Sequence, residues 1–392
     1  MPVKTDRIWS KGFTILILSN TLYWTGIYML VPSIPLYLVT LGAAETQVGV
    51  VATIYFVSSI ITRLLVNVLL QRVGKKLLMV VGVLLNSMIM VSYSFAGSIG
   101  IIAVLRVVQG FGFGTTTTII MAMAADTLPD SRRGQGIGYF GLGTVVAMSV
   151  APALSINLVN SFGFRAMFFT SAGILLMTTI IISFVEEPPI VAVKEEKSKK
   201  TVQWRNLFDR KLIVPSVLLL LIGVSRSSDM QFIAIFARER KLEYLSLYFV
   251  IQTAAMFCIR FISGRFADRK GRNWVLIPGG VALFAMGVIL SFADRSWIML
   301  LGAVFSGLGV GVLSPGLQLW MFNSVAPEKR NVASATYFNF TDIGISAGAL
   351  MMGFTAENFG YPIMFRIAAL AALLHIIGCL TVGRDKKQIT SL

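Results

Sequence analysis

The sequence predicts an all-α integral membrane protein with twelve transmembrane helices in two pseudo-symmetric six-helix bundles. Of its 392 residues, 56% are hydrophobic and only 13% are charged, which is too apolar for a soluble protein of this length. Apolar runs of about 20 residues, enough to cross a ~30 Å hydrocarbon layer, recur along the whole chain. Motifs of the first half also return in the second half at a constant offset, since Arg72 and Gly74 recur as Arg269 and Gly271. Such an internal repeat predicts two equivalent bundles.

The apolar runs between charged or Gly/Pro-bearing breaks locate the twelve helices. The first bundle, residues 1–185, holds helices at 13–40, 46–70, 77–96, 99–125, 134–160 and 165–185. The second bundle, residues 212–392, holds helices at 212–236, 244–266, 274–293, 296–322, 332–356 and 362–383. The long polar segment 186–211 is predicted to be a cytoplasmic linker between the two bundles.

The distribution of basic residues predicts the orientation in the membrane. If the N-terminus is inside, 24 of the 34 Lys and Arg residues lie in inner segments and five lie in outer loops. By the positive-inside rule, both termini are expected in the cytoplasm of a multi-pass protein of the bacterial cell (inner) membrane. The same asymmetry accounts for the net charge of +16 without a nucleic-acid partner.

The chain has little material for enzymatic or metal chemistry. Its two cysteines, Cys258 and Cys379, and its one histidine, His375, all lie in apolar spans, so no metal site or catalytic triad is expected. The glycine-rich stretch at 110–114 lies inside an apolar span and indicates helix packing, and no phosphate-binding loop occurs. We therefore expect no cofactor and no enzymatic activity.

Two sets of motifs connect the chain with a known family. The family's loop signature between helices 2 and 3 is matched in part at 67–76 and more fully at 264–272. The fourth-helix signature is matched by Arg106, which lies three residues before Gln109-Gly110. The fifth-helix Gly-Pro signature of antiporters is replaced by Ala151-Pro152. Over essentially its whole length the chain resembles a twelve-helix transporter of the major facilitator superfamily, most similar to the proton-coupled drug and metabolite exporters.

The repeated basic loops are predicted to gate the transporter. A carboxylate at a helix end can hold nearby basic groups and helix N-termini, and so latch two helices in one state. The first loop has Gln71 in place of the acidic residue, so its latch would rest on weaker neutral hydrogen bonds, with Asp126 as an alternative source of a carboxylate. The other reading is that the loops only anchor the topology. The candidate gating residues are Arg72, Gly74, Asp126, Asp268, Arg269, Gly271 and Arg272.

Ionisable groups inside spans are the candidates for proton coupling, because such groups are costly in a bilayer. Asp342 is the first candidate, and its alternative role is a structural hydrogen bond to Thr341 or Asn339. Asp229 is the second candidate. It lies three residues from Arg226, so the two could form a static pair or a proton-switched contact.

The resemblance implies a role in proton coupling for Arg106 as well. Its span carries no deep carboxylate, which favours zwitterionic, anionic or neutral cargo over cations.

The predicted substrate pocket combines aromatic rings with a few polar groups, as suits an amphiphilic small molecule. The first span places Asn20, Trp24 and Tyr28 four residues apart, with Tyr23 alongside. These rings are equally compatible with membrane-interface positions. The remaining pocket candidates are Arg226, Asn339, Gln318 and Trp320.

Together these features predict a secondary active transporter that exports a drug or a secreted metabolite (a metallophore among them) by proton antiport with alternating access. Its expected partners are a small-molecule substrate, protons and the lipid bilayer, and it is expected to act as a monomer. A proton symporter or facilitator that imports a sugar, organic acid or peptide is one alternative. A non-transporting sensor or assembly partner is another.

Overall fold

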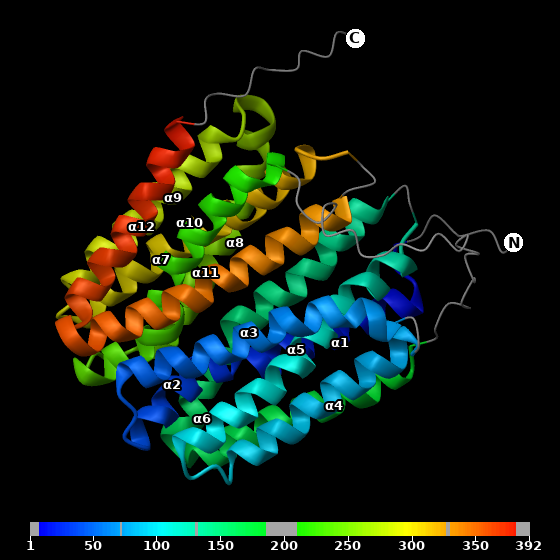
Figure 1. Ribbon diagram of the computed structural model, residues 1–392, viewed down its shortest axis with the longest axis horizontal. Coiled ribbons are helices and arrows are strands. Elements are labelled where there is room, and N and C mark those ends of the chain that lie inside the picture. The colour runs from blue at the N-terminus through cyan, green and yellow to red at the C-terminus, as the bar shows by residue number, and fades with distance from the viewer. Residues whose placement is uncertain (1–7, 71–72, 130–131, 186–209, 327–329, 382–392) are drawn as a thin grey trace, which may run out of the picture. The chain divides into compact units, whose positions relative to one another are not determined.

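The protein is described here by a computed structural model that covers residues 8–70, 73–129, 132–185, 210–326 and 330–381 (Figure 1). Within these ranges the chain is helical and contains no strand. Its contacts divide it into two compact units. Unit 1 comprises residues 1–41 and 54–201, and unit 2 comprises residues 42–53 and 202–392.

The helices of unit 1 follow the predicted spans. Ser10 and Ser98 begin two of them by accepting hydrogen bonds from the backbone N–H groups of Phe13 and Ile101. These caps satisfy amide groups that a helix start leaves unbonded. The helices are α1 (Lys11–Tyr28), α2 (Leu30–Thr40), α3 (Glu45–Leu70), of which the part from residue 54 belongs to this unit, α4 (Lys75–Tyr93), α5 (Ile99–Thr127) and α6 (Arg133–Ser183).

Three of the predicted spans in unit 1 are divided or joined differently from the prediction. The first span is two helices, α1 and α2, which meet at Met29 shortly before Pro32 and Pro35. Ser155 on α6 donates to the Met29 carbonyl at 2.6 Å and so satisfies this junction. In contrast, the fifth and sixth spans form the single element α6, which turns at Gly163, where φ is 80° and ψ is 174°. Positive φ is accessible to glycine without strain, so Gly163 supplies the turn between two spans.

The helices of unit 2 likewise match the predicted spans in order. A short 3₁₀ turn, Arg210–Leu212, leads into the first of them. The helices are α7 (Ile213–Glu239), α8 (Leu245–Lys270), α9 (Asn273–Ser291), α10 (Ser296–Asn323), α11 (Arg330–Phe359) and α12 (Tyr361–Thr381).

The prediction of a polytopic helical membrane protein is confirmed. Nine helical stretches within the described ranges are long and apolar enough to cross a membrane. One of them, 135–183, has 49 residues and contains the turn at Gly163, so it accounts for two spans. The remaining predicted spans correspond to α8 and α11, which carry more polar residues. Within the hydrocarbon layer, every backbone N–H and C=O group must form a hydrogen bond inside the protein. Helices meet this requirement within each span, which explains why the described spans are helical.

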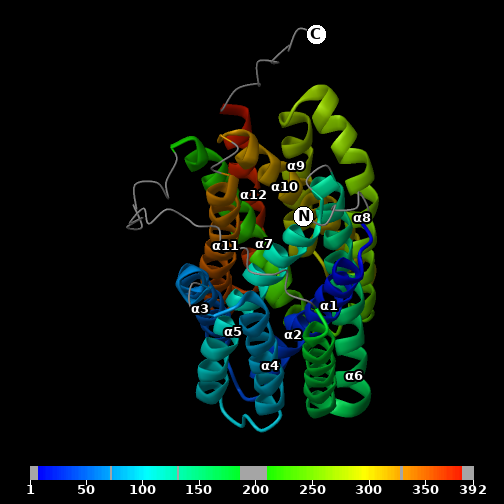
Figure 2. The same cartoon turned by 90° about the vertical axis from the view of Figure 1, so that its right-hand side faces the viewer.

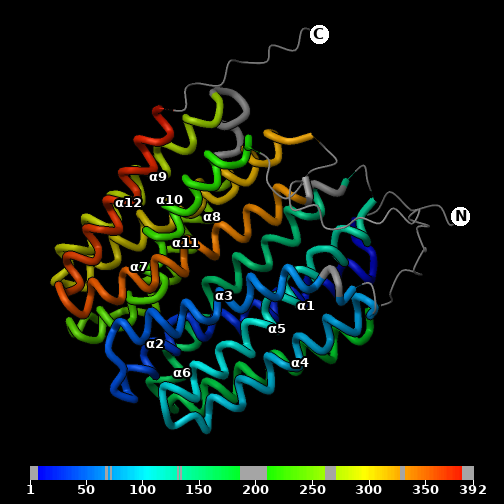
Figure 3. The backbone as a smooth tube through the Cα atoms, viewed as in Figure 1, coloured from blue at the N-terminus to red at the C-terminus, as the bar shows by residue number. Residues whose placement is uncertain are grey.

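Three helix pairs of unit 1 have counterparts in unit 2. In unit 1, α6 packs against α1 and α4, and α4 packs against α5. In unit 2, α11 packs against α7, α12 packs against α9, and α9 packs against α10. The pair α4 and α6 can be followed in Figure 2, and the pair α9 and α12 in Figure 3. The helix pairs therefore repeat in the order that the sequence repeat predicts.

Residues 42–53 pack with unit 2, although the sequence assigns them to the first bundle. The backbone N–H of Thr46 donates to Glu357 at 3.1 Å, and the Tyr361 hydroxyl donates to Glu45 at 3.1 Å. Further along, the Thr53 hydroxyl donates to the Ser346 carbonyl at 2.9 Å. A domain boundary drawn from composition could not reveal these contacts, since the polar segment 186–211 shows only where the two predicted bundles are connected. Most of that segment lies outside the described residues, so the linker stays a prediction.

Glycines allow α7 and α11 to approach within backbone contact. A Cβ atom added at Gly223 would meet the Gly344 Cα at 2.8 Å, and one added at Gly348 would meet the Val224 Cα at 2.7 Å. Because no real side chain tolerates such distances, both helices need glycine at these points. Small residues at a helix interface permit this close approach in membranes.

We predict that Gly344→Leu destabilises the protein. The added side chain must push α11 away from α7, and overpacking of this kind costs about 1–3 kcal/mol or more. Gly173→Leu is the matched control, since a Cβ atom at Gly173 meets nothing within 4 Å. Thermal unfolding of the detergent-purified variants should give a lower midpoint for Gly344→Leu alone. Equal midpoints for the two variants would contradict the assigned packing.

Candidate functional site

A buried carboxylate in unit 2 is surrounded by hydrogen-bond donors from two other helices. Asp229 on α7 is 2% exposed. Its Oδ2 accepts hydrogen bonds from Ser306 Oγ on α10 at 2.5 Å, from Gln252 Nε2 on α8 at 2.8 Å and from the Tyr248 hydroxyl on α8 at 3.3 Å. Gln252 Nε2 also donates to Ser306 Oγ at 2.7 Å, which closes the group into a network. We call these four residues the Asp229 cluster.

Three members of the Asp229 cluster were not among the predicted site residues. Tyr248, Gln252 and Ser306 are neutral side chains in apolar spans, and such residues attract no attention in a search for ionisable groups. They lie 19, 23 and 77 residues from Asp229, so no local spacing joins them to it. The sequence feature that could have indicated these partners is the run of glycines on α10, because glycines allow α10 to lie close to α8. At Gly311, for example, an added Cβ atom would meet the Met256 carbonyl oxygen at 2.9 Å.

The predicted pair of Arg226 and Asp229 does not form as an ion pair. Both residues are described, yet their charged atoms are farther apart than the 4.0 Å of a salt bridge. Arg226 is half-buried and acts on Asp229 only through space. The static-pair interpretation is therefore wrong, because the donors that satisfy the carboxylate are the hydroxyl and amide groups of α8 and α10.

The first proton-coupling candidate, Asp342, lies on α11 and is 7% exposed. The hydroxyl of neighbouring Thr341 donates to the Tyr337 carbonyl at 2.8 Å, within its own helix. Asn339, a predicted pocket residue, is half-buried on the same helix, and its Oδ1 has no hydrogen-bond partner among the described residues.

A buried cation in unit 1 is bonded only by neutral groups. Arg106 on α5 is 7% exposed, and its Nη1 donates to Gln109 Oε1 at 3.0 Å. The Tyr93 hydroxyl on α4 donates to the same Gln109 oxygen at 2.8 Å. The Arg106 guanidinium also lies 4.9 Å from the ring centre of Tyr55 on α3. Unit 1 therefore carries a buried guanidinium, whereas unit 2 carries a buried carboxyl group.

The predicted aromatic face of the first span is only partly assembled as expected. Trp24 and Tyr28 are half-buried and stacked, with ring centres 5.1 Å apart, and Trp24 also contacts Phe113 on α5 at 5.6 Å. Tyr23, in contrast, is fully buried. The Asn20 amide donates to α6, to the Phe140 carbonyl at 3.2 Å and to the Thr144 hydroxyl at 3.1 Å. Asn20 thus fixes α1 against α6.

The two predicted pocket residues of α10 have different environments. Gln318 is half-buried on α10. The ring of Trp320 lies 3.9 Å from the guanidinium of Arg272, which precedes the first residue of α9. This cation–π contact joins a predicted pocket residue to a predicted gating residue.

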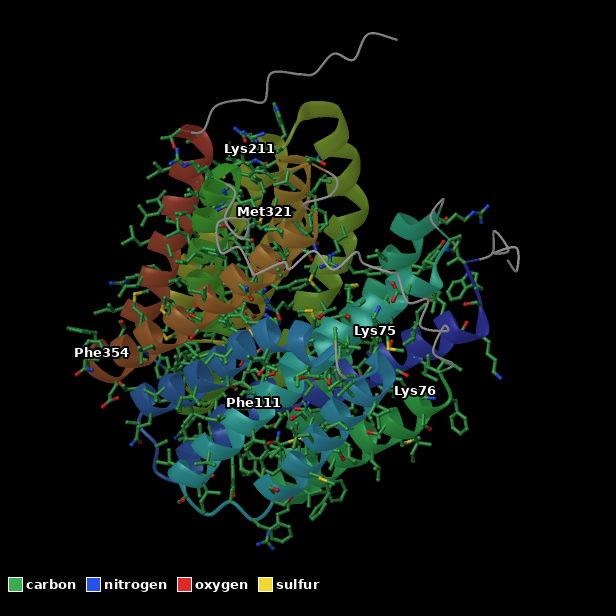
Figure 4. The ribbon with its side chains drawn as sticks, turned by 45° about the vertical axis from the view of Figure 1, so that its right-hand side comes forward. Lys75, Lys76, Phe111, Lys211, Met321 and Phe354 are labelled. Atoms are coloured by element: carbon green, nitrogen blue, oxygen red, sulfur yellow. The ribbon has the colours of Figure 1, made fainter. Side chains whose placement is uncertain are left out.

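The two repeated loops use different interactions. In unit 1, Lys75 at the start of α4 (labelled in Figure 4) forms an ion pair of 2.5 Å with Asp126 in the last turn of α5, so Asp126 does supply a carboxylate to this loop. In unit 2, Gly271 has φ of 91°, a conformation that favours glycine, whereas Gly74 has an ordinary φ of −61°. Arg72 and the side chains of Asp268 and Arg269 lie outside the described residues.

The comparisons with known proteins agree with this architecture. The family model of the Major Facilitator Superfamily matches residues 16–277 and 242–391. The multidrug resistance protein MdtG of Serratia proteamaculans is 23% identical over 389 residues, which cover 94% of this chain and 93% of that protein. MdtG of Proteus mirabilis is 24% identical over 390 residues, covering 95% and 96%.

Solved structures of transporters share the fold. The nucleoside transporter NupG has a TM-score of 0.77 at 12% identity, over 95% of this chain and 99% of that one. A bacterial homolog of the human lysosomal transporter Spinster has a TM-score of 0.72 at 14% identity, over 95% and 96%. These structures support the fold, and the family model covers nearly the whole chain. The chain therefore belongs to the Major Facilitator Superfamily of non-enzymatic membrane transporters.

Proposed function

We propose that this transporter exports small amphiphilic organic molecules, either drugs or secreted metabolites, in exchange for protons. Its relatives that match over more than nine-tenths of both chains are named as multidrug resistance proteins. The half-buried, stacked rings of Trp24 and Tyr28 supply the apolar, aromatic surface that such cargo requires. Family membership makes alternating access between two bundles the expected mode of transport.

The Asp229 cluster is the observation that carries the proton part of this proposal. A carboxylate inside a transmembrane span is costly, so its presence there indicates function. Three donors face Asp229 Oδ2, which suits the deprotonated carboxylate. A hydroxyl group can also accept a hydrogen bond, so Ser306 can turn to accept one once Asp229 carries a proton. The cluster can therefore satisfy both protonation states with the same residues.

In the proposed cycle, Asp229 takes up a proton from outside and releases it inside, and cargo binds from the cytoplasm after that release. The positive charge of Arg226 on the same helix attracts the deprotonated carboxylate. Asp342 is the second candidate for the proton carrier, since it is also buried within a span of unit 2.

The proposal includes the cellular setting of the transporter. The excess of Lys and Arg in alternate loops supports a bacterial inner-membrane protein with both termini in the cytoplasm. We propose that the monomer is the transporting species, because each bundle has its own polar centre.

We predict that Asp229→Asn abolishes proton exchange. The amide keeps the size of the side chain but cannot take up and release a proton. Everted vesicles with an acidic interior, monitored by a pH-sensitive dye, should lose their gradient when an amphiphilic cargo is added to the wild type. The Asp229→Asn variant should show at least a tenfold smaller response.

Asp294→Asn, an exposed acidic residue after α9, is the matched control and should respond like the wild type. Asp342→Asn is measured in parallel. A full response from Asp229→Asn with none from Asp342→Asn would move the proton carrier to α11. Cargo uptake into intact cells, without extrusion, would contradict export and favour the importing alternative.

We also propose that the ion pair between Lys75 and Asp126 gates transport. Both side chains are 43% exposed, so the pair adds only about 0–1 kcal/mol to stability. Lys75 stands at the positive end of α4 and Asp126 near the negative end of α5, so each charge is opposed by the dipole of its own helix. The pair is therefore poorly explained as a stabilising device, which favours a role in the transport cycle.

We predict that Lys75→Asp and Asp126→Lys each reduce the transport rate several-fold with little change in the unfolding midpoint. The double exchange restores the pair with favourable helix dipoles and should recover transport. Arg210→Glu, an exposed basic residue before α7, is the control for a general change of surface charge. Unchanged transport in both single variants would leave the loop as a topology anchor only.

A further inference from the structure

The guanidinium of Arg106 in unit 1 has an unfilled hydrogen-bonding position. The side chain is 93% buried, being 7% exposed, and its Nε has no hydrogen-bond partner among the described residues. Its Nη1 is bonded to Gln109, and Gln109 is held in turn by the Tyr93 hydroxyl. A guanidinium that is oriented by neighbours but not fully bonded is prepared to receive an acceptor group.

No acidic side chain of the described part of unit 1 neutralises this charge. The one described carboxylate in that unit is Asp126, which bonds Lys75. Asp126 lies 20 residues beyond Arg106 on the same helix α5, which corresponds to about 30 Å. The groups that do contact Arg106 are an amide oxygen and the ring of Tyr55, both neutral. The buried charge therefore favours an anionic group at this position.

A row of aromatic rings extends from this charge. Tyr55, whose ring lies against Arg106, contacts Phe113 with ring centres 5.2 Å apart. Phe113 contacts Trp24 at 5.6 Å, and Trp24 is stacked on Tyr28. All of these residues belong to unit 1. The planes of these rings are tilted to one another, and the guanidinium of Arg63 lies 5.9 Å from the ring centre of Phe113. Unit 1 thus offers a largely apolar row of rings with Arg106 at its Tyr55 end and Arg63 beside Phe113.

We propose that Arg106 binds a carboxylate group of the cargo, while the aromatic row binds its apolar body. Guanidinium is suited to this role because its planar donors match the two oxygens of such a group. Gln109 and Tyr93 are positioning residues that hold the guanidinium. This inference deepens the proposed export function and rests on it: the preferred cargo is an amphiphile with an acidic head.

The test compares an acid with its own ester. Rhodamine B carries a free carboxylate, and its ethyl ester has the same ring system without it; dansylglycine and its methyl ester form a second pair. Binding to the purified protein is measured by fluorescence polarisation. The wild type should bind each acid at least tenfold more tightly than its ester. Arg106→Gln should lose this preference by weakening acid binding at least tenfold while ester affinity changes less than threefold.

Arg165→Gln, an exposed arginine on α6, is the matched control and should behave like the wild type. Arg106→Lys keeps the charge without the planar donors and should retain part of the preference. The thermal unfolding midpoint of each variant shows whether it is folded. Removal of an unneutralised buried charge should not lower stability, so Arg106→Gln should unfold at or above the midpoint of the wild type. Equal affinity for acid and ester, or equal loss of both in Arg106→Gln, would overturn the proposal, as would the failure of either acid to bind.

Two further measurements distinguish this inference from a site for a free inorganic anion and from the proposed export function. Sodium phosphate is titrated against bound rhodamine B, and displacement at the same micromolar concentrations would assign the site to a free inorganic anion instead. Vesicle assays with both dye forms separate the inference from the export function. Proton release with the ester alone would leave antiport intact and refute acid recognition. Acid binding that depends on Arg106 but releases no protons would refute antiport and leave the binding site intact.

Discussion

The structure depends on one constraint: a polar group inside the hydrocarbon layer must find a partner within the protein. For the backbone this requirement selects helices throughout the described residues. Where a helix is interrupted, a partner is supplied, as Ser155 does for the Met29 carbonyl between α1 and α2. Close helix packing then follows from glycine, because the backbones of α7 and α11 meet at Gly223 and Gly344. Lipid supplies no hydrophobic force between helices, so these close contacts contribute much of the association.

The same constraint distinguishes the two polar centres. Asp229 is surrounded by hydroxyl and amide donors, and hydroxyl groups can reverse their role when a proton arrives. Arg106 cannot lose its proton, and its hydrogen bonding is incomplete. A group that can be satisfied in two protonation states suits coupling to a proton gradient, whereas a fixed, incompletely bonded cation suits binding of an acid. One transporter can therefore use its two bundles for different tasks.

Three helix pairs of unit 1 have counterparts in unit 2. At the repeated loop, the described residues of unit 1 form an ion pair between Lys75 and Asp126, and those of unit 2 place the guanidinium of Arg272 on the ring of Trp320. The ion pair is half-exposed, so dissolved salt should weaken it. The interactions that the structure describes at the two loops are therefore of different kinds.

The sequence by itself determined the membrane class and the order of the spans, because both depend on composition and on runs of apolar residues. It also gave Asp229, Asp342 and Arg106 as candidates, since ionisable residues stand out in apolar spans. Only the tertiary structure decided which groups meet them. Ser306 reaches Asp229 from 77 residues away, and residues 42–53 pack with the unit to which the sequence did not assign them. Such partners depend on which faces of the helices meet. In a membrane protein, lipid and protein core are equally apolar, so the sequence of a span shows little difference between its lipid-facing side and its buried side.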